Sequence, residues 1–598
     1  MNKKGSLLTA LLLVGLRLLA QDTAIVIRAN QVAFDRRSPK MAVIESSQRL
    51  SLALSFELVS GDGKVLPGGA LKGTYRVEEW TPLKYLYRAD FSAVDRPGSY
   101  RIRLATGGHT VLSAPFIIRD AALASLTIPS ILHYYRKQRA NTPTEWSVDA
   151  HIPLFGSDST VDMRGGWCDA SGDVSKYFSH LAYANFMSPQ QTPLVTWSLV
   201  SARETAPRLL ARLGVLDSID DEALWGADYM MRALSPQGYF RMIVFSYFNK
   251  DPHARRVVGL LANSVTTSDY ACAFREGGGM AIAALARISR WKKDGAFTSA
   301  AYLEGAKRAF AHLMVRNLAY DDDGRENIID DYCALMAATE LWLATDSTNS
   351  IDSTESAGYR DQARLRAAHL EERLSPSGYF IADTGSRPFW HASDAGLPVV
   401  ALARYLTAEH DPARREAALS VIRSALAYNL RVTNDVSNPY GYARQTFRYQ
   451  GRITEGFFIP HDNETGWWWQ GENARLASLA TAALVGGRLI SADGRVPDSL
   501  AAFAGRQLSW ILGGNPYGIC FLYGFGQANV PYMHSNFGHG SERGGVSNGI
   551  TGAEGHGDGS GIDYKTEDKG NEWRWTEQWI PHAAWFLQAV TAGDIDND

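Results

Sequence analysis

The sequence predicts a mainly α-helical fold in which a toroid of paired helices follows a small β-sandwich. Short stretches of alternating apolar and polar residues, separated by turns, run from about residue 24 to residue 118. From about residue 121, long segments carry apolar residues at three- and four-residue spacing, which is typical of helices packed on one face. Because strands and helices do not alternate along the chain, an all-α toroid is favoured over a parallel α/β sheet.

The N-terminal strands are predicted from alternation and from turn residues. The clearest one follows the Pro97-Gly98 turn, where Tyr100-Arg-Ile-Arg-Leu104 alternates between apolar and polar side chains. About seven short strands with turns between them suit a small sandwich over residues 24–118. The segments are 24–28, 40–45, 55–59, 75–80, 100–104 and 111–118.

The helical part is predicted to span residues 121–594 and to hold about a dozen helices in pairs. The segment 538–561 contains ten glycines and no helical periodicity. A loop this long inside a compact domain is typical of a functional element. The clearest helical patterns are 222–232, 279–290, 300–316, 331–343, 361–373, 398–406, 414–429, 473–485 and 499–512.

The first 20 residues are predicted to be a signal peptide. Lys3 and Lys4 precede an apolar run over 7–16, and Ala20 offers a small residue at the end. This order of charge, apolar run and small residue indicates export to a secreted or periplasmic location. The alternative is an N-terminal anchor that is not cleaved. No later stretch approaches the 18 apolar residues that a membrane span needs.

Composition narrows the classes of partner. The 598 residues include 60 Lys and Arg against 63 Asp and Glu, which gives a formal net charge of −3. So balanced a chain has no electrostatic reason to bind nucleic acid. An apolar share of 45% excludes a disordered chain. The 16 Trp residues exceed what a core of this size needs, so a binding role is expected for some of them.

The residues that ligate metals form no recognisable metal motif. The four cysteines, Cys168, Cys272, Cys333 and Cys520, are scattered and contain no CxxC pair, so buried free thiols are expected. Asp321-Asp322-Asp323-Gly324 is rich in carboxylates but lacks the EF-hand spacing. A solvated loop is favoured there, with a structural calcium ion as the alternative. No catalytic metal or cofactor is predicted.

Two aspartates in a glycine-bearing loop are the first candidate for catalysis. Asp169 and Asp173 lie four residues apart in Gly165-Gly-Trp-Cys-Asp-Ala-Ser-Gly-Asp173. A loop lets two carboxylates converge on one water molecule, and their repulsion then tunes both pKa values. The alternative is that both carboxylates cap turns.

The second candidate is Glu577, which is surrounded by tryptophans. It follows Trp573-Arg-Trp-Thr576 and precedes Gln578-Trp579. A carboxyl held among aromatic rings has a raised pKa, as a general acid requires. The alternative is an acidic residue placed at the N-terminus of the next helix, where the dipole favours negative charge.

Aromatic residues near these acids are predicted to contact sugar rings. Sugar rings present flat C–H faces that stack on aromatic side chains, so tryptophans in loops beside carboxylates indicate carbohydrate. Packing of the same rings in the core is the alternative. The candidate substrate-binding residues are Trp167, Trp390, His391, Trp468, Trp573 and Trp575.

Together these features resemble glycoside hydrolase family 9, an inverting cellulase family. Asn30-Gln-Val-Ala-Phe34 is similar to the immunoglobulin-like domain that precedes many of its catalytic domains. Tyr134-Tyr-Arg-Lys-Gln-Arg139 is similar to the entry to the catalytic domain, and 165–173 matches its paired-aspartate motif with one extra residue. The resemblance implies an (α/α)6 barrel behind an immunoglobulin-like sandwich, a β-linked glycan as partner and no cofactor.

The resemblance also implies roles for individual residues. Asp173 would activate water, Asp169 would help to hold that water, and Glu577 would be the acid. Glu572, which follows Asn571, competes with Glu577 because some members of the family carry Asn-Glu. The favoured residue is Glu577, which lies nearer the apolar helix.

The chain departs from the family where the substrate is held. The family's His-His-Arg motif is absent after Gly524-Phe-Gly526, and His534 is the candidate to replace one histidine. These departures disfavour plain cellulose as the substrate. The alternative to an endo-acting enzyme is an exo-acting β-glucosidase or β-glucosaminidase of the same family. If one end of the substrate cleft is closed, as exo cleavage requires, residues 241–268 or 538–561 are expected to close it.

Three further classes of protein are compatible with the sequence. The first is a toroidal polysaccharide lyase, for which Tyr532 and His534 would be the catalytic candidates. The second is a non-catalytic glycan-binding protein, which would keep the aromatic residues without needing the acids. The third is a purely structural protein, in which the aspartates would lie far apart. The paired-aspartate motif disfavours all three.

Overall fold

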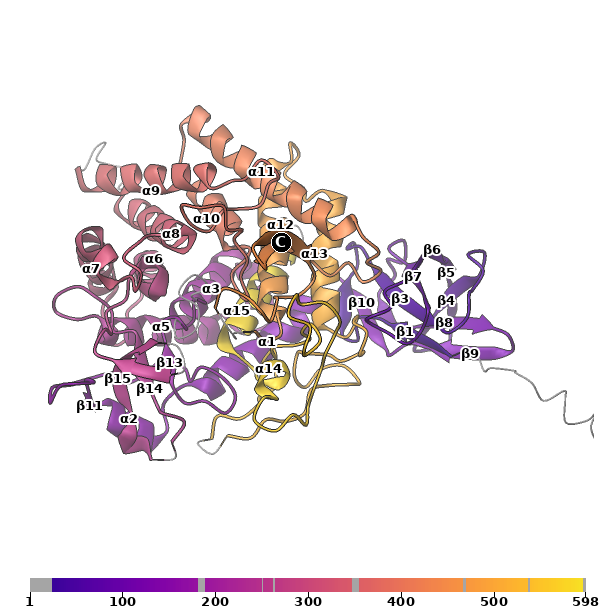
Figure 1. Ribbon diagram of the computed structural model, residues 1–598, viewed down its shortest axis with the longest axis horizontal. Coiled ribbons are helices and arrows are strands. Elements are labelled where there is room, and N and C mark those ends of the chain that lie inside the picture. The colour runs from indigo at the N-terminus through magenta and orange to yellow at the C-terminus, as the bar shows by residue number, and fades with distance from the viewer. Residues whose placement is uncertain are drawn as a thin grey trace, which may run out of the picture.

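A computed structural model shows a β-sandwich joined to a larger helical domain (Figure 1). The signal peptide predicted over residues 1–20 lies outside the described residues. The structure describes residues 24–180, 189–249, 251–261, 264–346, 354–465, 469–535 and 538–594.

The N-terminal domain is a sandwich of two sheets. One sheet has the strand order β1-β3-β7-β6, and the other has the order β2-β10-β8-β4-β5 with β9 paired to β8. In β8 the side chains of Tyr100, Ile102 and Leu104 are buried and their neighbours are more exposed, as alternation predicts. The strands are β1 (Ile25–Arg28), β2 (Ala33–Asp35), β3 (Met41–Ser46), β4 (Ser55–Ser60), β5 (Val65–Ala70), β6 (Lys72–Tyr75), β7 (Tyr85–Asp90), β8 (Gly98–Thr106), β9 (His109–Leu112) and β10 (Phe116–Arg119).

One predicted strand is wrong in part. Alternation predicts an extended segment over 75–80, but β6 ends at Tyr75 and residues 78–80 form a turn. The reason is Trp80, which is 5% exposed and packs against Phe457 and Trp510 of the helical domain, with ring centroids 4.6 and 5.6 Å away. Burying a tryptophan across the domain boundary outweighs the local preference for a strand.

Among the described residues, six helices form a closed inner ring. Each of these helices contacts the next member of the ring, and the last one, α15, contacts the first one, α3. Every residue of α6 is buried, because an inner helix is covered on all sides and is therefore apolar all round. The inner helices are α3 (Thr192–Thr205), α6 (Gly279–Ser289), α8 (Ile328–Thr345), α10 (Leu397–Tyr405), α12 (Asn473–Ile490) and α15 (Ile580–Asp594).

A second layer of helices surrounds this ring, so the predicted (α/α)6 barrel is confirmed. Each outer helix packs against one or two inner helices, as α7 does on α6 and α8. Figure 1 shows the helices of both layers to one side of the sandwich. The outer helices are α1 (Ala122–Gln138), α5 (Leu216–Ala233), α7 (Ser299–Tyr320), α9 (Thr354–Glu372), α11 (Pro412–Asn434) and α13 (Asp498–Ile511).

The two domains are joined by polar as well as aromatic contacts. The Arg88 guanidinium on β7 donates to the main-chain carbonyls of Asn438 and Pro439, at 2.6 and 3.0 Å. The Tyr440 hydroxyl donates to the buried Glu45 carboxylate. These contacts fix the sandwich against α13 and the 438–442 loop. Within the described residues, no helix has the length and apolarity to cross a membrane.

Candidate active site

The loop with the paired aspartates is held in place through its main chain. The Cys168 amide donates to the Gln138 carbonyl at the end of α1 (2.8 Å), and the Lys176 ammonium donates to the Gly165 carbonyl (2.9 Å). Gly166 has a φ of +72°, and a Cβ there would lie 2.9 Å from the Tyr229 ring. The tight passage of the loop against α5 therefore requires glycine at residue 166.

The same loop pairs with a segment about four hundred residues further along the chain. The Ser171 amide donates to the Gln578 carbonyl (2.8 Å), and the Ile580 amide donates to the Asp169 carbonyl (3.1 Å). The Ser171 hydroxyl accepts from the Gln578 amide (2.9 Å). This short ladder brings Glu577 beside the two aspartates.

Asp169 is the most enclosed of the three acids. Its side chain is buried, and burial, followed by the charges of Asp173 and Glu577, raises its pKa well above the usual range. The Trp579 indole N–H donates to its Oδ1 at 2.7 Å. That bond fixes the direction of the Asp169 carboxyl.

Asp173 has more hydrogen-bond donors than its neighbour. Its Oδ1 accepts from the Ser175 amide (2.8 Å) and from the Ser246 hydroxyl (3.4 Å). Burial raises its pKa, while these donors and the Arg255 guanidinium act in the opposite direction. Because the pKa of Asp169 and Glu577 is raised further, Asp173 is the carboxyl of the three that ionises most readily.

Glu577 lies at the end of the short helix α14 (Trp573–Thr576). Burial, and then the charge of Asp173, raise its pKa well above the usual range. Its main-chain carbonyl accepts from the Asn548 amide (2.9 Å), and Asn548 also bonds its side chain. Residue 548 belongs to the glycine-rich segment 538–561, which therefore supports Glu577.

The competing acid, Glu572, is placed differently. Its Oε2 accepts from the Gly570 amide (2.6 Å), and its main-chain carbonyl accepts from the Thr576 hydroxyl (2.8 Å). These bonds close the turn before α14. Asp169, Asp173 and Glu577 interact with one another, whereas Glu572 is absent from the groups that shift their pKa values.

A buried triad of charged side chains, Asp149, Lys176 and Arg255, supports the aspartate loop. Asp149 accepts from the Lys176 ammonium (2.7 Å) and from Nε and Nη2 of Arg255 (3.0 and 3.1 Å). Arg255 also donates to the Val174 carbonyl (2.9 Å). All three side chains are nearly inaccessible to water. Removing one partner of such a group leaves an uncompensated buried charge, which is strongly destabilising.

The described residues also bring together Glu145, Cys168 and His539, whose ligating atoms lie within 4.8 Å of one another. His539 Nε2 lies 2.9 Å from the Glu145 carboxylate, and Nδ1 lies 3.1 Å from the Lys137 carbonyl. Burial alone lowers the pKa of His539, but Cys168 and Glu145 outweigh it and raise this pKa to about 11. An imidazolium donates both of these bonds, and a metal would have to displace its proton. The His539 carbonyl accepts from the Gly172 amide (2.9 Å), so this ion pair also anchors the aspartate loop.

The acidic segment 321–323, for which calcium is the alternative to a solvated loop, is paired with the side chain of Arg275. Arg275 lies with Nε 3.1 Å from Asp321 and with Nη2 2.9 Å from both Asp322 and Asp323. The guanidinium is fully buried. It thus supplies positive charge to the carboxylates that a calcium ion would have used.

Four of the predicted sugar-binding side chains lie in the interior of this structure. Trp167 and Trp575 are 0% exposed, and their indole N–H groups donate to Glu222 (3.2 Å) and Thr551 (2.9 Å). Trp390 and His391 are buried as well. A tryptophan whose N–H finds an acceptor gains more from burial than from exposure, so the rings of Trp167 and Trp575 complete the core.

Two predicted sugar contacts remain at the surface. His534 is exposed, and its carbonyl would lie 3.5 Å from a Cβ at Gly172, so its segment borders the aspartate loop. Trp573 is half-buried, with the Arg574 guanidinium 4.6 Å from its ring centroid. Trp468 lies outside the described residues.

Three residues outside the named set of site residues contact members of that set. Trp469 is half-buried and stacks on His461 with ring centroids 3.8 Å apart. Asn548 and Ser246 contact the acids from loops far away in sequence. Trp469 belongs to the Trp467-Trp468-Trp469 run, which is a recognisable signal. No local pattern distinguishes Asn548 or Ser246 from other loop residues.

Models of two protein domains together match most of the chain. The model described as glycosyl hydrolase family 9 matches residues 127–585. The model described as the cellulase N-terminal ig-like domain matches residues 22–109. A xyloglucan-specific endo-beta-1,4-glucanase of Bacteroides ovatus is 28% identical over 177 residues. That match covers 26% of this chain and only 28% of the relative's length.

Solved structures share the fold. A Bacteroides ovatus GH9 protein superposes with a TM-score of 0.65 at 19% identity, covering 96% of this chain and 99% of the other. The cellulase Cel9M of C. cellulolyticum has a TM-score of 0.50 at 16% identity, covering 79% of this chain and 98% of the other. At these identities the likeness concerns the fold alone.

The clustered carboxyls generate a prediction about stability. A carboxyl whose pKa is raised on folding binds its proton more tightly in the folded state, so its contribution is present below the unfolded pKa and is lost as pH rises through the folded pKa. We expect Asp169→Asn and Glu577→Gln to gain stability over the wild type as pH rises from 4 to 8, by on the order of 1 kcal/mol or more. Thermal unfolding measured across this pH range tests it. Curves of Asp169→Asn and Glu577→Gln that run parallel to the wild-type curve would contradict the raised pKa values of these two carboxyls.

Proposed function

Because the chain belongs to glycosyl hydrolase family 9, we propose that it hydrolyses β-linked glucans with inversion of configuration. The observation that carries the proposal is the desolvated group of Asp169, Asp173 and Glu577. Three carboxyls in one dry site cannot all ionise together. Their environments separate them into acid and base, as hydrolysis of a glycosidic bond requires.

Glu577 is the proposed general acid. Its raised pKa favours the protonated form, which can give a proton to the leaving oxygen. The Asn548 side chain limits the directions in which the Glu577 carboxyl can turn.

Asp173 is the proposed base. It ionises before the other two acids, and its Ser175 and Ser246 donors stabilise the carboxylate. In the proposed step Asp173 takes a proton from a water molecule on the face of the sugar opposite Glu577. Asp169, held by Trp579, helps to position that water. An inverting mechanism expects acid and base carboxyls roughly 6.5–9.5 Å apart.

The proposed substrate is a β-1,4-linked glucan or a decorated form of it. Support comes from the Bacteroides ovatus relative, whose name states specificity for xyloglucan. Trp573 is half-buried and is the proposed stacking surface, because aromatic faces complement the C–H faces of sugars. The Arg574 guanidinium lies 4.6 Å from its ring centroid and 4.0 Å from that of Trp469, whose other face stacks on His461.

Exo action is the second candidate, and one feature favours it. The sheet of β13 (Lys176–Tyr177), β14 (Ile243–Phe245), β15 (Arg256–Leu261) and β16 (Val265–Thr267) places Ser246 on Asp173. The next residues, Tyr247 and Phe248, have φ values of 57° and 51°, and Phe248 is 65% exposed. Aromatic residues held in this costly conformation beside the base would form a wall at one end of a cleft.

We further propose that the protein is exported to a secreted or periplasmic location, on the strength of residues 1–20. The N-terminal sequence of the protein recovered from the expressing cells checks this. A chain that begins near Gln21 is expected, and a chain that retains Met1 would contradict cleavage.

Activity on defined glycans tests the proposed reaction. We expect the purified protein to release sugar from xyloglucan or a β-1,4-glucan, with the new reducing end first appearing as the α-anomer by NMR. Glucose as the sole product indicates exo action, and a series of oligosaccharides indicates endo action. Retention of configuration, an unsaturated product or binding without cleavage would each overturn the proposal in favour of a retaining enzyme, a lyase or a glycan-binding protein.

A matched pair of variants tests the acid. Glu577→Gln should lower kcat on an unactivated glycan by about 10²–10⁴-fold, because it removes the proton donor. Glu572→Gln changes the same residue type five positions away and should retain activity close to that of the wild type. If Glu572→Gln is the variant that loses activity, the roles of the two glutamates are reversed. Circular dichroism of both variants verifies that each is folded.

A further inference from the structure

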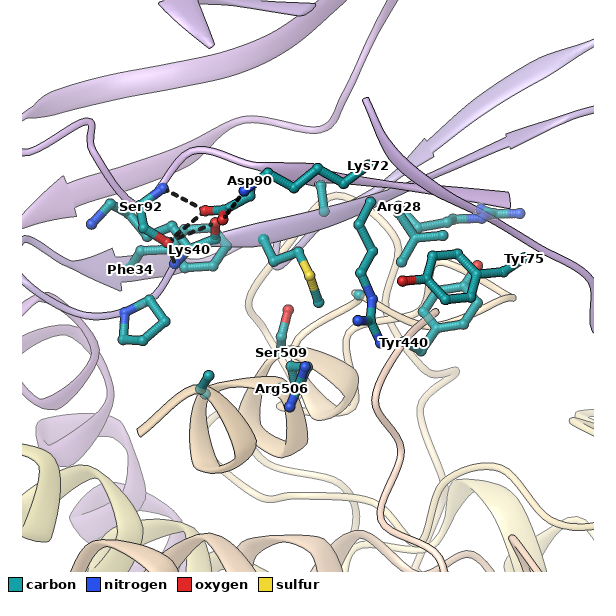
Figure 2. Close-up of a pocket in the computed structure, with 18 residues that line it drawn as sticks. Arg28, Phe34, Lys40, Lys72, Tyr75, Asp90, Ser92, Tyr440, Arg506 and Ser509 are labelled. Carbon is teal, nitrogen blue, oxygen red and sulfur yellow. Dashed lines mark hydrogen bonds and ion pairs between the residues drawn. The ribbon is translucent and has the colours of Figure 1, made fainter. Parts of the chain in front are cut away.

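A pocket of about 280 Å³ lies between the sandwich and the helical domain. Figure 2 shows Arg506 and Ser509 on the helix at one side, and Lys72 and Asp90 on the strands, with Lys40 just before β3, at the other. The barrel buries one face of α13, and Ala502, Gly505, Arg506 and Ser509 lie on its other face, toward the sandwich. Residues of two domains thus form one cavity.

The lining of this pocket carries far more positive than negative charge. Five cationic side chains contribute to it, but Asp90 is the one carboxylate among its lining residues. Asp90 is already committed, because it accepts from the Lys72 ammonium (2.9 Å) and from the Ser92 hydroxyl (2.7 Å). The cations are Arg28, Lys40, Lys72, Arg88 and Arg506.

Three of the cations have their own counter-groups. Lys72 pairs with Asp90, and Arg28 lies 3.9 Å from the Glu45 carboxylate. Lys40 donates to two main-chain carbonyls at 2.8 Å and is further stabilised by the charge of Asp35. Lys40 and Lys72 therefore need no additional anion, whereas Arg28 has a carboxylate nearby but a buried Nε without a hydrogen bond.

Arg88 and Arg506 have no carboxylate partner among the described residues. Arg88 uses its Nε and Nη2 on carbonyls of the 438–442 loop and stacks 4.8 Å from the centroid of Tyr75. The buried Nε of Arg506 has no hydrogen-bond partner. Burial, and then the nearby charge of Arg88, lower the pKa of Arg506 to about 10. Two guanidiniums that repel each other across a cavity leave the interface electrostatically incomplete.

We propose that this interdomain pocket binds a small oxyanion between Arg88 and Arg506. A carboxylate, sulfate or phosphate group matches the planar fork of a guanidinium and would neutralise both charges at once. The Ser509 hydroxyl and the Tyr75 ring line the same space. The anion would link a strand of the sandwich to a helix of the barrel, so binding would strengthen the contact between the domains.

The size of the cavity limits what carries the oxyanion. A volume of about 280 Å³ is near the lower end of small-molecule pockets. It suits an inorganic ion with water or an acidic monosaccharide, and it excludes a polymer chain. The shared chemistry is the oxyanion, and the two sources are distinguished by experiment.

Isothermal titration calorimetry on the full-length protein tests the proposal. The titrants are sodium sulfate, sodium phosphate and sodium glucuronate, with glucose and sodium chloride at matched ionic strength as controls. We expect saturable binding of at least one oxyanion and none of glucose or chloride. Tighter binding of glucuronate than of sulfate or phosphate identifies an acidic sugar, and the opposite order identifies an inorganic ion. Absence of binding by all three oxyanions would overturn the proposal.

Variants show whether the anion occupies this pocket. Arg506→Gln should weaken binding about tenfold or more, because it removes a charge-assisted bond, whereas Arg506→Lys should weaken it less. Arg495→Gln removes an exposed arginine that precedes the same helix and should bind like the wild type. Equal binding by Arg506→Gln and the wild type would refute the site.

Arg506→Gln is well suited to test the site because Arg506 has no carboxylate partner among the described residues, so its replacement breaks no ion pair. In the absence of anion, Arg506→Gln should melt at or above the wild-type temperature, and the stabilisation that the anion gives the wild type should disappear. The measurement involves no glycan and none of the proposed catalytic residues. Its failure would leave the proposed hydrolysis intact, and failure of the proposed hydrolysis would leave the anion site intact.

Discussion

The proposed chemistry depends on one short main-chain ladder, in which 169–171 pairs with 578–580. The Ser171 and Ile580 amides bond across it, and they join a loop that follows α1 to the start of α15. Without that pairing, Glu577 would have no fixed relation to Asp169 and Asp173. With it, three carboxyls lie close together, and their pKa values are raised because burial penalises every additional negative charge.

Holding acids in a dry site is costly, and the surrounding polar groups offset that cost. Asp149 with Lys176 and Arg255 supports the aspartate loop on one side. The pair of Glu145 and His539 supports it as well. These groups are themselves buried and satisfied, so they stiffen the loop rather than attract water to it. The acids are therefore pre-organised before any substrate arrives.

The sandwich contributes to the molecule at a distance from these acids. It inserts Trp80 among the aromatic rings of the helical domain and binds the 438–442 loop through Arg88. Lys40, Lys72 and Arg88 of the sandwich line a cavity opposite Arg506 of α13, where the proposed oxyanion would bind. The same interface thus combines apolar burial, which favours any close contact, with a charge pattern that selects one orientation.

The sequence by itself determined the order of strands and helices and the positions of the acids, because periodicity and the paired-aspartate motif are local patterns. It did not reveal α1 or α3 as clear helices, and it misjudged 76–80, where Trp80 prefers a distant partner. It also did not reveal that Trp167 and Trp575 are buried. Only the tertiary structure decided which way each ring turns. Their acceptors, Glu222 and Thr551, are 55 and 24 residues away in the chain, and a tryptophan is buried when folding brings such an acceptor to its N–H.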